Sequence, residues 1–307
     1  MKPNYKYLWN RTPDKQYKNL LLEILNEGEK DDAQSGVPTI SRIAPVSMRF
    51  KFENGFPLIT ERNMNPKTSE SLPITVWQQA IAEICAFING ARTLKEFEDY
   101  GCYWWKDFLT EKKCTKRGLE PGDNGPGSYG AAFHDFPMPD GETFNQFEFI
   151  IRQILENPIL KTHFISPWIP YYTFRVTGHK QKVVVCPCHG WIFIRIMNNK
   201  LTLNMIQRSG DVPIGVPSNM CQYAALTMMI AQVTKTVPYE YVHSFMDAHI
   251  YENQIPAVKT ILSREDRIFP IVEMDDSITN LFDFRKEHFV LKEYNPHPGI
   301  KGIPVTI

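Results

Sequence analysis

The chain has 307 residues, a formal net charge of zero, 43% hydrophobic and 22% charged residues. This length can bury a large core, and the balanced charge excludes a global field that would attract nucleic acid or a membrane surface. No apolar run is long enough to span a membrane, and residues 1–6 lack the apolar segment of a secretory signal. We therefore expect one domain over residues 1–307, located in the cytoplasm, with neither membrane nor nucleic acid as its main partner.

The first half of the chain predicts two helices, one strand and an irregular segment. Apolar residues recur at helical spacing over residues 17–28, where a glycine ends the run. Residues 48–52 alternate and lead into an Asn-Gly pair, which predicts a strand that enters a tight turn. The wide apolar arc of residues 71–90 predicts a mostly buried helix. The irregular residues 101–123 predict a surface segment, within which 109–123 is the expected insertion.

The second half predicts two more helices and a set of strands. Residues 144–157 form an amphipathic pattern that a proline ends. A long apolar helix is expected over 220–233, opened by Pro217-Ser218-Asn219. Three short strands are expected, the last two joined by an Asn-Asn hairpin turn, over residues 183–185, 191–197 and 201–206. Strands combined with long buried helices favour the α+β class, in which helices pack on a sheet.

Cys188 and Arg208 are the residues that indicate chemistry most directly. A thiol attacks only as the thiolate, and a nearby guanidinium lowers its pKa. The same arginine can bind a phosphate through two parallel hydrogen bonds. The pair therefore indicates covalent catalysis on a phosphorylated substrate. A buried structural thiol is the alternative; a metal site with Cys186 and His189 is disfavoured by the Cys-x-Cys spacing, so we expect no metal.

Several motifs in one order resemble the thymidylate synthase family. They are Cys188-His189, Gln207 to Asp211, Gly215 to Asn219, Asp247 to Tyr251, and Pro296 to Lys301. The resemblance covers most of the chain and implies an α+β fold with a mixed sheet and packed helices. It also implies a homodimer that transfers a one-carbon unit from 5,10-methylenetetrahydrofolate to C5 of a pyrimidine nucleotide.

In this family the nucleophile, here Cys188, adds to C6 of the ring and makes C5 nucleophilic. Hydride transfer from tetrahydrofolate then gives a methyl group, whereas addition of water gives a hydroxymethyl group. The expected reaction is methylation of dUMP to dTMP. The nearest alternative is hydroxymethylation of dUMP, dCMP or CMP. A distant alternative is a nucleotide- or RNA-binding protein without catalytic activity.

The resemblance assigns three further residues to catalysis. Glu83 matches a carboxylate that organises proton transfer through water, and burial should raise its pKa towards neutrality. The alternative for Glu83 is a structural carboxylate paired with an arginine. Tyr129 matches a tyrosine that assists the proton step near C5, and His189 follows the nucleophile as the family expects.

The resemblance also assigns residues to the two substrates. For the nucleotide, Arg208 and Ser209 would hold the phosphate with Gln207 in the same motif, and Asn219 would read the pyrimidine edge and favour uracil. The alternative for Asn219 is a helix cap. His249 and Tyr251, two apart on one strand face, would bind the sugar. For the folate, the expected residues are Asp211, Trp105, Gly215 and the tail that ends at Ile307.

Some positions depart from the family pattern. Gln34 stands where the family carries a phosphate-binding arginine, and Lys161 and Thr162 stand for two arginines that the partner subunit contributes. Lysine keeps the charge but loses the bidentate geometry. Ser218 replaces a phenylalanine and Phe108 a second tryptophan, while 173–181 are extra residues. These changes indicate an altered nucleotide, whereas Trp105 and the closing tail favour methylation over hydration.

Overall fold

The computed structural model describes residues 2–33, 36–66 and 74–306. Its centre is a seven-stranded sheet with the order β1-β2-β9-β7-β6-β5, and β8 pairs with β9. The sheet is mixed, as expected, because β9 runs antiparallel to β2 and parallel to β7. The strands are β1 (Glu29–Asp31), β2 (Thr39–Lys51), β5 (Phe164–Ile165), β6 (Trp191–Met197), β7 (Lys200–Gln207), β8 (Gly210–Asp211) and β9 (Val237–Tyr251).

Helices and two small hairpins surround the sheet. The hairpins pair β3 (Phe136–Pro137) with β4 (Thr143–Phe144) and β10 (Ile271–Met274) with β11 (Phe289–Lys292). The helices are α1 (Gln16–Glu27), α2 (Val76–Ile88), α3 (Leu94–Tyr100), α4 (Glu111–Thr115), α5 (Tyr129–His134), α6 (Gln146–Glu156), α7 (Pro170–Thr173), α8 (Gly215–Val233) and α9 (Ile255–Leu262). Among the described residues, no helix combines the length and the apolarity that crossing a membrane requires.

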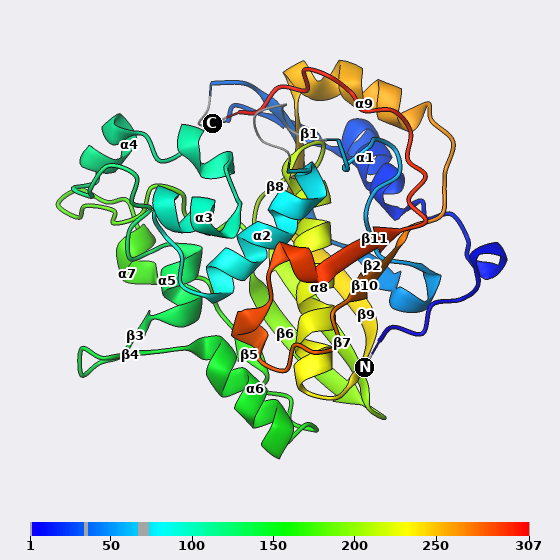
Figure 1. Cartoon of the computed structure of the whole chain (residues 1–307). Helices are drawn as coiled ribbons and strands as arrows, with labels where there is room; N and C mark the ends of the chain where they lie inside the picture. The colour runs from blue at the N-terminus through cyan, green and yellow to red at the C-terminus, as the bar shows by residue number, and fades with distance from the viewer. Residues whose placement is uncertain (1, 34–35, 67–73, 307) are drawn as a thin grey trace.

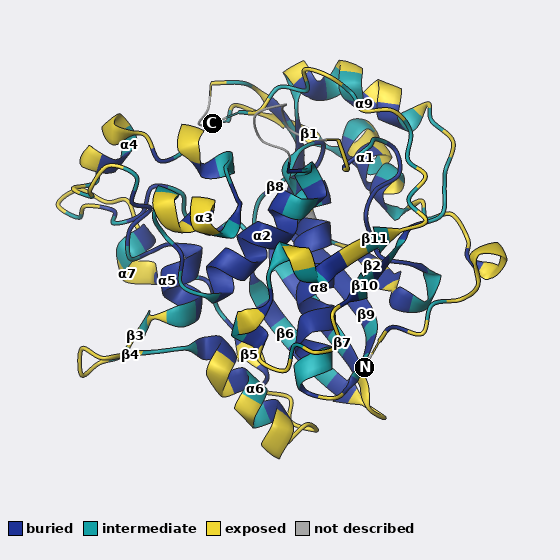
Figure 2. Ribbon diagram, in the orientation of Figure 1, coloured by how far each residue is buried: buried dark blue, intermediate teal, exposed yellow. Residues whose placement is uncertain are grey.

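Two buried helices form the middle layer of the molecule. In Figure 1, α2 crosses α8, and α8 lies against the strands β7 and β9. Figure 2 shows both helices in the colour of buried residues along most of their length, whereas α4 is largely exposed and α9 is exposed on one side. The N-terminus of α2 has a capping box, in which the Thr75 and Gln78 side chains each bind the other's backbone N–H. The polar residues that α2 and α8 carry inward face each other in the core, where the Gln222 amide of α8 donates to Glu83 of α2.

Most predicted elements are confirmed, with shifted ends. The helices over 17–28 and 144–157 are α1 and α6, and the Asn-Asn hairpin is present with φ of 51° at Asn198 and 60° at Asn199. The strand at 48–52 is the end of the longer β2. The helix expected over 71–90 begins at Val76, and its predicted residues 71–73 lie outside the described part of the chain.

Three predictions of local structure were wrong. Residues 183–185 are not a strand, because the backbone N–H groups of Val184 and Val185 bind the backbone and side-chain oxygens of Asn124 instead of a strand. The helix expected at 220 begins at Gly215, so Pro217 sits inside its first turn, where a proline is tolerated. The segment 109–123 is not wholly irregular, since it contains α4 and buries Leu109 and Cys114.

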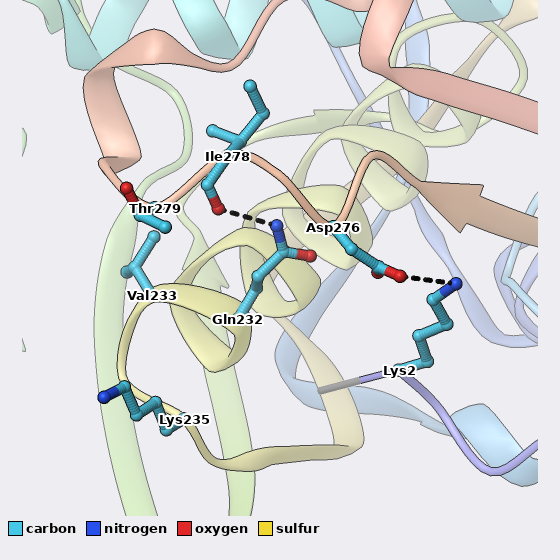
Figure 3. Close-up of a pocket in the computed structure, with 7 residues that line it drawn as sticks. All are labelled: Lys2, Gln232, Val233, Lys235, Asp276, Ile278 and Thr279. Atoms are coloured by element: carbon cyan, nitrogen blue, oxygen red, sulfur yellow. Dashed lines mark hydrogen bonds and ion pairs between the residues drawn. The ribbon is translucent and has the colours of Figure 1, made fainter.

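Lys2, near the N-terminus, and the segment that follows β10 meet at the C-terminal end of α8. Figure 3 shows the Gln232 amide nitrogen donating to the Ile278 carbonyl at 2.8 Å, and the Lys2 ammonium paired with Asp276. Gln232 also donates to the carbonyl of Asp275 at 2.8 Å. These contacts join segments far apart in sequence at a surface depression, and no cysteine or histidine is among its lining residues.

Gly130, next to the predicted catalytic Tyr129, allows a close approach between α5 and the end of α2. A Cβ atom there would lie 2.2 Å from the carbonyl oxygen of Ala91, which is backbone and cannot turn aside. We expect Gly130→Ala to lower the free energy of unfolding by about 1–3 kcal/mol in urea denaturation. Gly299→Ala is the matched control, because nothing lies within 4 Å of its Cβ position. An equal loss of unfolding free energy in both variants would contradict the conclusion that close packing requires a glycine at position 130.

Candidate active site

A cavity of about 650 Å³ lies where α2, the start of α8 and the ends of β7 and β9 converge. Its wall contains most of the predicted site residues. They are Glu83, Trp105, Tyr129, Cys188, His189, Gln207, Ser209, Asp211, Gly215, Asn219, His249 and Tyr251. The two residues that depart from the family pattern in this region, Phe108 and Ser218, also line it. The fold therefore brings together residues that span more than half of the sequence.

Cys188 lies within reach of Arg208, as predicted. The Arg208 Nη2 atom is 3.4 Å from Cys188 Sγ and 3.3 Å from the Cys186 carbonyl oxygen, and its Nε donates to the Pro187 carbonyl at 2.8 Å. The guanidinium also lies over the Trp168 ring, 5.4 Å from its centroid. These contacts fix the guanidinium against the loop that carries the sulfur.

The net effect on the thiol differs from the prediction. Burial raises the pKa of Cys188, and the Arg208 charge opposes that rise without reversing it. The physical reason is that burial removes part of the hydration of the thiolate, which one guanidinium compensates only in part. The pair therefore keeps Cys188 mainly as a thiol in the free protein.

Tyr129 and His189 pack beside the nucleophile. The Tyr129 hydroxyl accepts a hydrogen bond from the Cys188 backbone N–H at 2.6 Å, and its ring stacks on His189 at 4.6 Å between centroids. The His189 Nδ1 atom lies 2.7 Å from the Tyr223 hydroxyl. Burial lowers the pKa of His189 to about 3, so its imidazole is neutral at physiological pH. His189 therefore acts in the site as a neutral hydrogen-bonding group and not as a cation.

Glu83 is buried and has no cationic partner among the described residues. Its Oε1 accepts from the Trp105 indole N–H at 2.7 Å, and its Oε2 accepts from the Gln222 amide. Burial raises the pKa of Glu83 to about 7, although both hydrogen bonds oppose the rise. The predicted elevation is confirmed, and the alternative of a structural pair with an arginine is wrong.

Asn219 lies in the first turns of α8, with its side chain in the cavity wall. Its Oδ1 accepts from Gln207 Nε2 at 3.1 Å, and its Nδ2 donates to Gln222 Oε1 at 3.0 Å. The N-cap residue of α8 is Ile214, so the alternative assignment of Asn219 as a helix cap is wrong. An amide held on both sides is suited to reading a base edge.

His249 and Tyr251 emerge from the end of β9 on one face, with ring centroids 5.3 Å apart. His249 Nδ1 lies 3.3 Å from Asp247 Oδ2. Beside them, the Asp211 carboxylate accepts from Gln254 Nε2 at 3.0 Å. Gln254 Nε2 also donates to the Pro304 carbonyl at 3.0 Å, and Val305 lines the cavity. Both strand residues and the C-terminal segment thus lie at the site.

Some predicted residues are not placed in this cavity. Lys161 is exposed and does not line it. Arg208 does not line it either, although its guanidinium contacts Cys188, which does. Gln34 and Ile307 lie outside the described residues.

The sequence did not single out Arg62, which lines the cavity and donates to the Pro213 carbonyl at 3.1 Å. Its buried Nε has no described partner, a signal that only the structure gives.

Comparison with known proteins adds one decisive finding. The family model described as thymidylate synthase matches residues 15–306 of this chain. The chain belongs to the thymidylate synthase family. Membership implies a transferase of pyrimidine nucleotide metabolism that carries a folate one-carbon unit to C5 of a pyrimidine. The family and the mixed α+β fold predicted from the motifs are confirmed.

The cavity wall fits the folate that thymidylate synthase family membership implies. Trp104, Trp105 and Phe108 line it and can contact a flat aromatic ligand such as a pterin, and the carboxylate of Asp211 can accept hydrogen bonds from ring N–H groups. Among the described residues, no group of three metal-ligating side chains is present.

Arg208 supplies the positive charge nearest to the nucleophile in this family member, so its replacement should be visible in thiol reactivity. We expect Arg208→Lys to slow alkylation of Cys188 by iodoacetamide about tenfold near pH 8, because an ammonium cannot reach the sulfur and two carbonyls together. Peptide mapping by mass spectrometry resolves Cys188 from Cys186. Arg195→Lys, on the exposed side of β6, is the control; an equal slowing there would contradict a local effect.

Proposed function

We propose that this protein methylates dUMP to dTMP with 5,10-methylenetetrahydrofolate. The observation that carries the proposal is the placing of one nucleophile, Cys188, beside the guanidinium of Arg208 and in one cavity with the carboxylate of Glu83. Covalent addition, anion binding and proton transfer can then act on a single nucleotide.

The first step would form a bond between Cys188 Sγ and C6 of the ring. The thiol proton leaves to solvent or a nearby base as the bond forms, and the electron pair of the C5–C6 double bond moves to C5 and O4. The Asn219 amide, in the cavity wall, can donate to O4 as its charge develops. C5 then bonds to the one-carbon unit.

The later steps depend on proton movement near Glu83. The proton on C5 is removed, the bond between the one-carbon unit and the folate nitrogen breaks, and Cys188 leaves C6 at the end. A carboxyl group with a pKa of about 7 can accept and return protons at physiological pH, directly or through water. The folate supplies the one-carbon unit and, for methylation, the hydride that completes the methyl group.

Enclosure of the site supports hydride transfer over hydration. Trp105 covers Glu83, its ring stacks on Phe97 at 4.7 Å, and Val305 of the C-terminal segment lines the same cavity. Walls of this kind exclude water from the carbon that accepts the hydride.

Hydroxymethylation of dUMP, dCMP or CMP is the second candidate. It is supported by Ser218 and Phe108 in the cavity wall, because a hydroxyl and a ring without a hydrogen-bonding group change the surroundings of the one-carbon unit.

A homodimer belongs to the proposal as well. Lys161 is exposed away from its own cavity, and the sheet leaves Ile43 and Met246 exposed on β2 and β9, which supports a contact with a second copy.

A panel of four nucleotides, dUMP, UMP, dCMP and CMP, tests the proposal in the presence of methylenetetrahydrofolate. Methylation of dUMP yields dihydrofolate, which absorbance detects, and a methylated product in mass spectrometry. Tetrahydrofolate with a hydroxymethylated product supports the second candidate. No product from any nucleotide, and no covalent adduct with a 5-fluoropyrimidine nucleotide, would refute both and leave a binding protein.

A further inference from the structure

Gln222 is a buried residue that no step of the proposed reaction uses. It lies three residues after Asn219 on α8, so the two side chains project from one face of the helix. Its Nε2 donates to Glu83 Oε2, and its Oε1 accepts from Asn219 Nδ2 at 3.0 Å. Gln222 does not line the cavity, whereas both of its partners do. It therefore connects the carboxylate of the site to the amide that faces the base.

The direction of these hydrogen bonds is set by Glu83. Above about pH 7, where Glu83 is ionised, its carboxylate can only accept, so the amide nitrogen of Gln222 must face it. The other Glu83 oxygen is already occupied by the Trp105 indole N–H. The oxygen of Gln222 then points at Asn219 and accepts from it. As a result, Asn219 has to turn its nitrogen towards Gln222.

Gln207 holds the other end of the Asn219 amide. Its Nε2 donates to the Ser209 carbonyl at 3.0 Å and to Asn219 Oδ1 at 3.1 Å, while its Oε1 lies 2.7 Å from His243 Nε2. A backbone carbonyl only accepts, so the Gln207 nitrogen cannot exchange places with its oxygen without losing that bond. Turning Asn219 over would therefore place two NH₂ groups opposite each other at Gln207 and two oxygens opposite each other at Gln222.

We propose that Gln222 is a positioning residue that makes this site select uracil over cytosine. The inference rests on the proposed function, in which Glu83 serves C5 of the ring. Gln222 lies between Asn219 and Glu83, so the Asn219 nitrogen points towards Glu83. Since Glu83 serves C5 of the ring, this nitrogen is on the side of C5 and of the neighbouring atom C4. It donates to O4 of uracil, and Asn219 Oδ1 accepts from N3–H. Cytosine presents the reverse pattern of donor and acceptor, which the held amide cannot match.

Equilibrium binding of the four nucleotides to the full-length protein tests the inference. The preference for uracil is the Kd of the cytosine nucleotide divided by the Kd of the uracil nucleotide that carries the same sugar, dCMP against dUMP and CMP against UMP. We expect Gln222→Met to lower the preference for uracil about tenfold, because methionine has similar length but cannot accept from Asn219. Glu83→Gln should lower the ratio as well, since its amide no longer requires the nitrogen of Gln222 to face it. A ratio is insensitive to partial loss of folded protein.

Gln146→Met is the matched control. Gln146 is also buried and donates to the carbonyls of Ala132 and Ser166, yet it does not line the cavity or contact the three amides. The ratio of the two Kd values for Gln146→Met should equal that of the wild type. An unchanged ratio in Gln222→Met, or a wild type that prefers cytosine, would overturn the inference. Uracil preference without turnover would refute the proposed function alone, and a wild type that binds none of the four nucleotides would refute both.

Discussion

Cys188→Ser is expected to lower kcat for the nucleotide that the wild type uses by at least about 10⁴-fold. A serine hydroxyl has a much higher pKa than a thiol, and Arg208, 3.4 Å from the sulfur, already fails to offset the burial of the thiolate. Without a bond to C6, C5 gains no electron density, and neither a methyl nor a hydroxymethyl group can be added. Initial rates across the four nucleotides measure the effect.

Binding of the nucleotide should survive this substitution within about tenfold, since Cys188 is not expected to hold it in the ground state. Cys186→Ser is the matched control, because its thiol accepts from Gln181 and does not line the cavity. Mass spectrometry with a 5-fluoropyrimidine nucleotide should find an adduct in the wild type and in Cys186→Ser only. Turnover near the wild-type rate in Cys188→Ser would remove covalent catalysis from the mechanism.

The predicted site residues that the structure brings together stand mostly in short motifs. Cys188, Arg208 and Asn219 each stand in a run whose order along the chain matches the family, and Glu83 stood out as a carboxylate on an apolar helical arc. Helical periodicity also predicted α1 and α6, because an amphipathic pattern over three turns depends on the local chain alone.

The features that the sequence did not reveal depend on contacts between distant segments. Val184 and Val185 have a strand-forming composition, but their N–H groups bind Asn124, about sixty residues earlier, and no pattern in the sequence records that choice. Gln222 looks like any polar residue in an apolar helix until α2 brings Glu83 against it. The net rise in the pKa of Cys188 has the same origin, because it follows from burial of the sulfur among distant segments and not from the spacing to Arg208.

Glu83→Gln is expected to lower kcat about 10²- to 10⁴-fold, because the amide cannot accept the C5 proton or pass it to water. The same change should alter how stability depends on pH. In the wild type the folded pKa of Glu83 is about 7, raised from an ordinary value of 4.5 by burial. Between these values the folded state holds a proton that the unfolded state has released.

Stability contributed by this proton is therefore present below pH 4.5 and is lost as pH rises towards 7, at a total of about 3 kcal/mol. Glutamine does not titrate, so Glu83→Gln lacks this pH-dependent contribution to the free energy of unfolding. Urea denaturation at pH 5 and pH 8 should show the wild type losing roughly that much relative to Glu83→Gln, and the comparison cancels any change that is independent of pH. Parallel stability curves would mean that Glu83 ionises in the folded protein near its ordinary pKa, and the assignment of Glu83 to proton transfer near neutrality would then fail. If the wild type loses this stability relative to Glu83→Gln between pH 5 and pH 8, and Glu83→Gln has lost turnover, then burial of the ionised carboxyl group destabilises the fold while it supports the reaction.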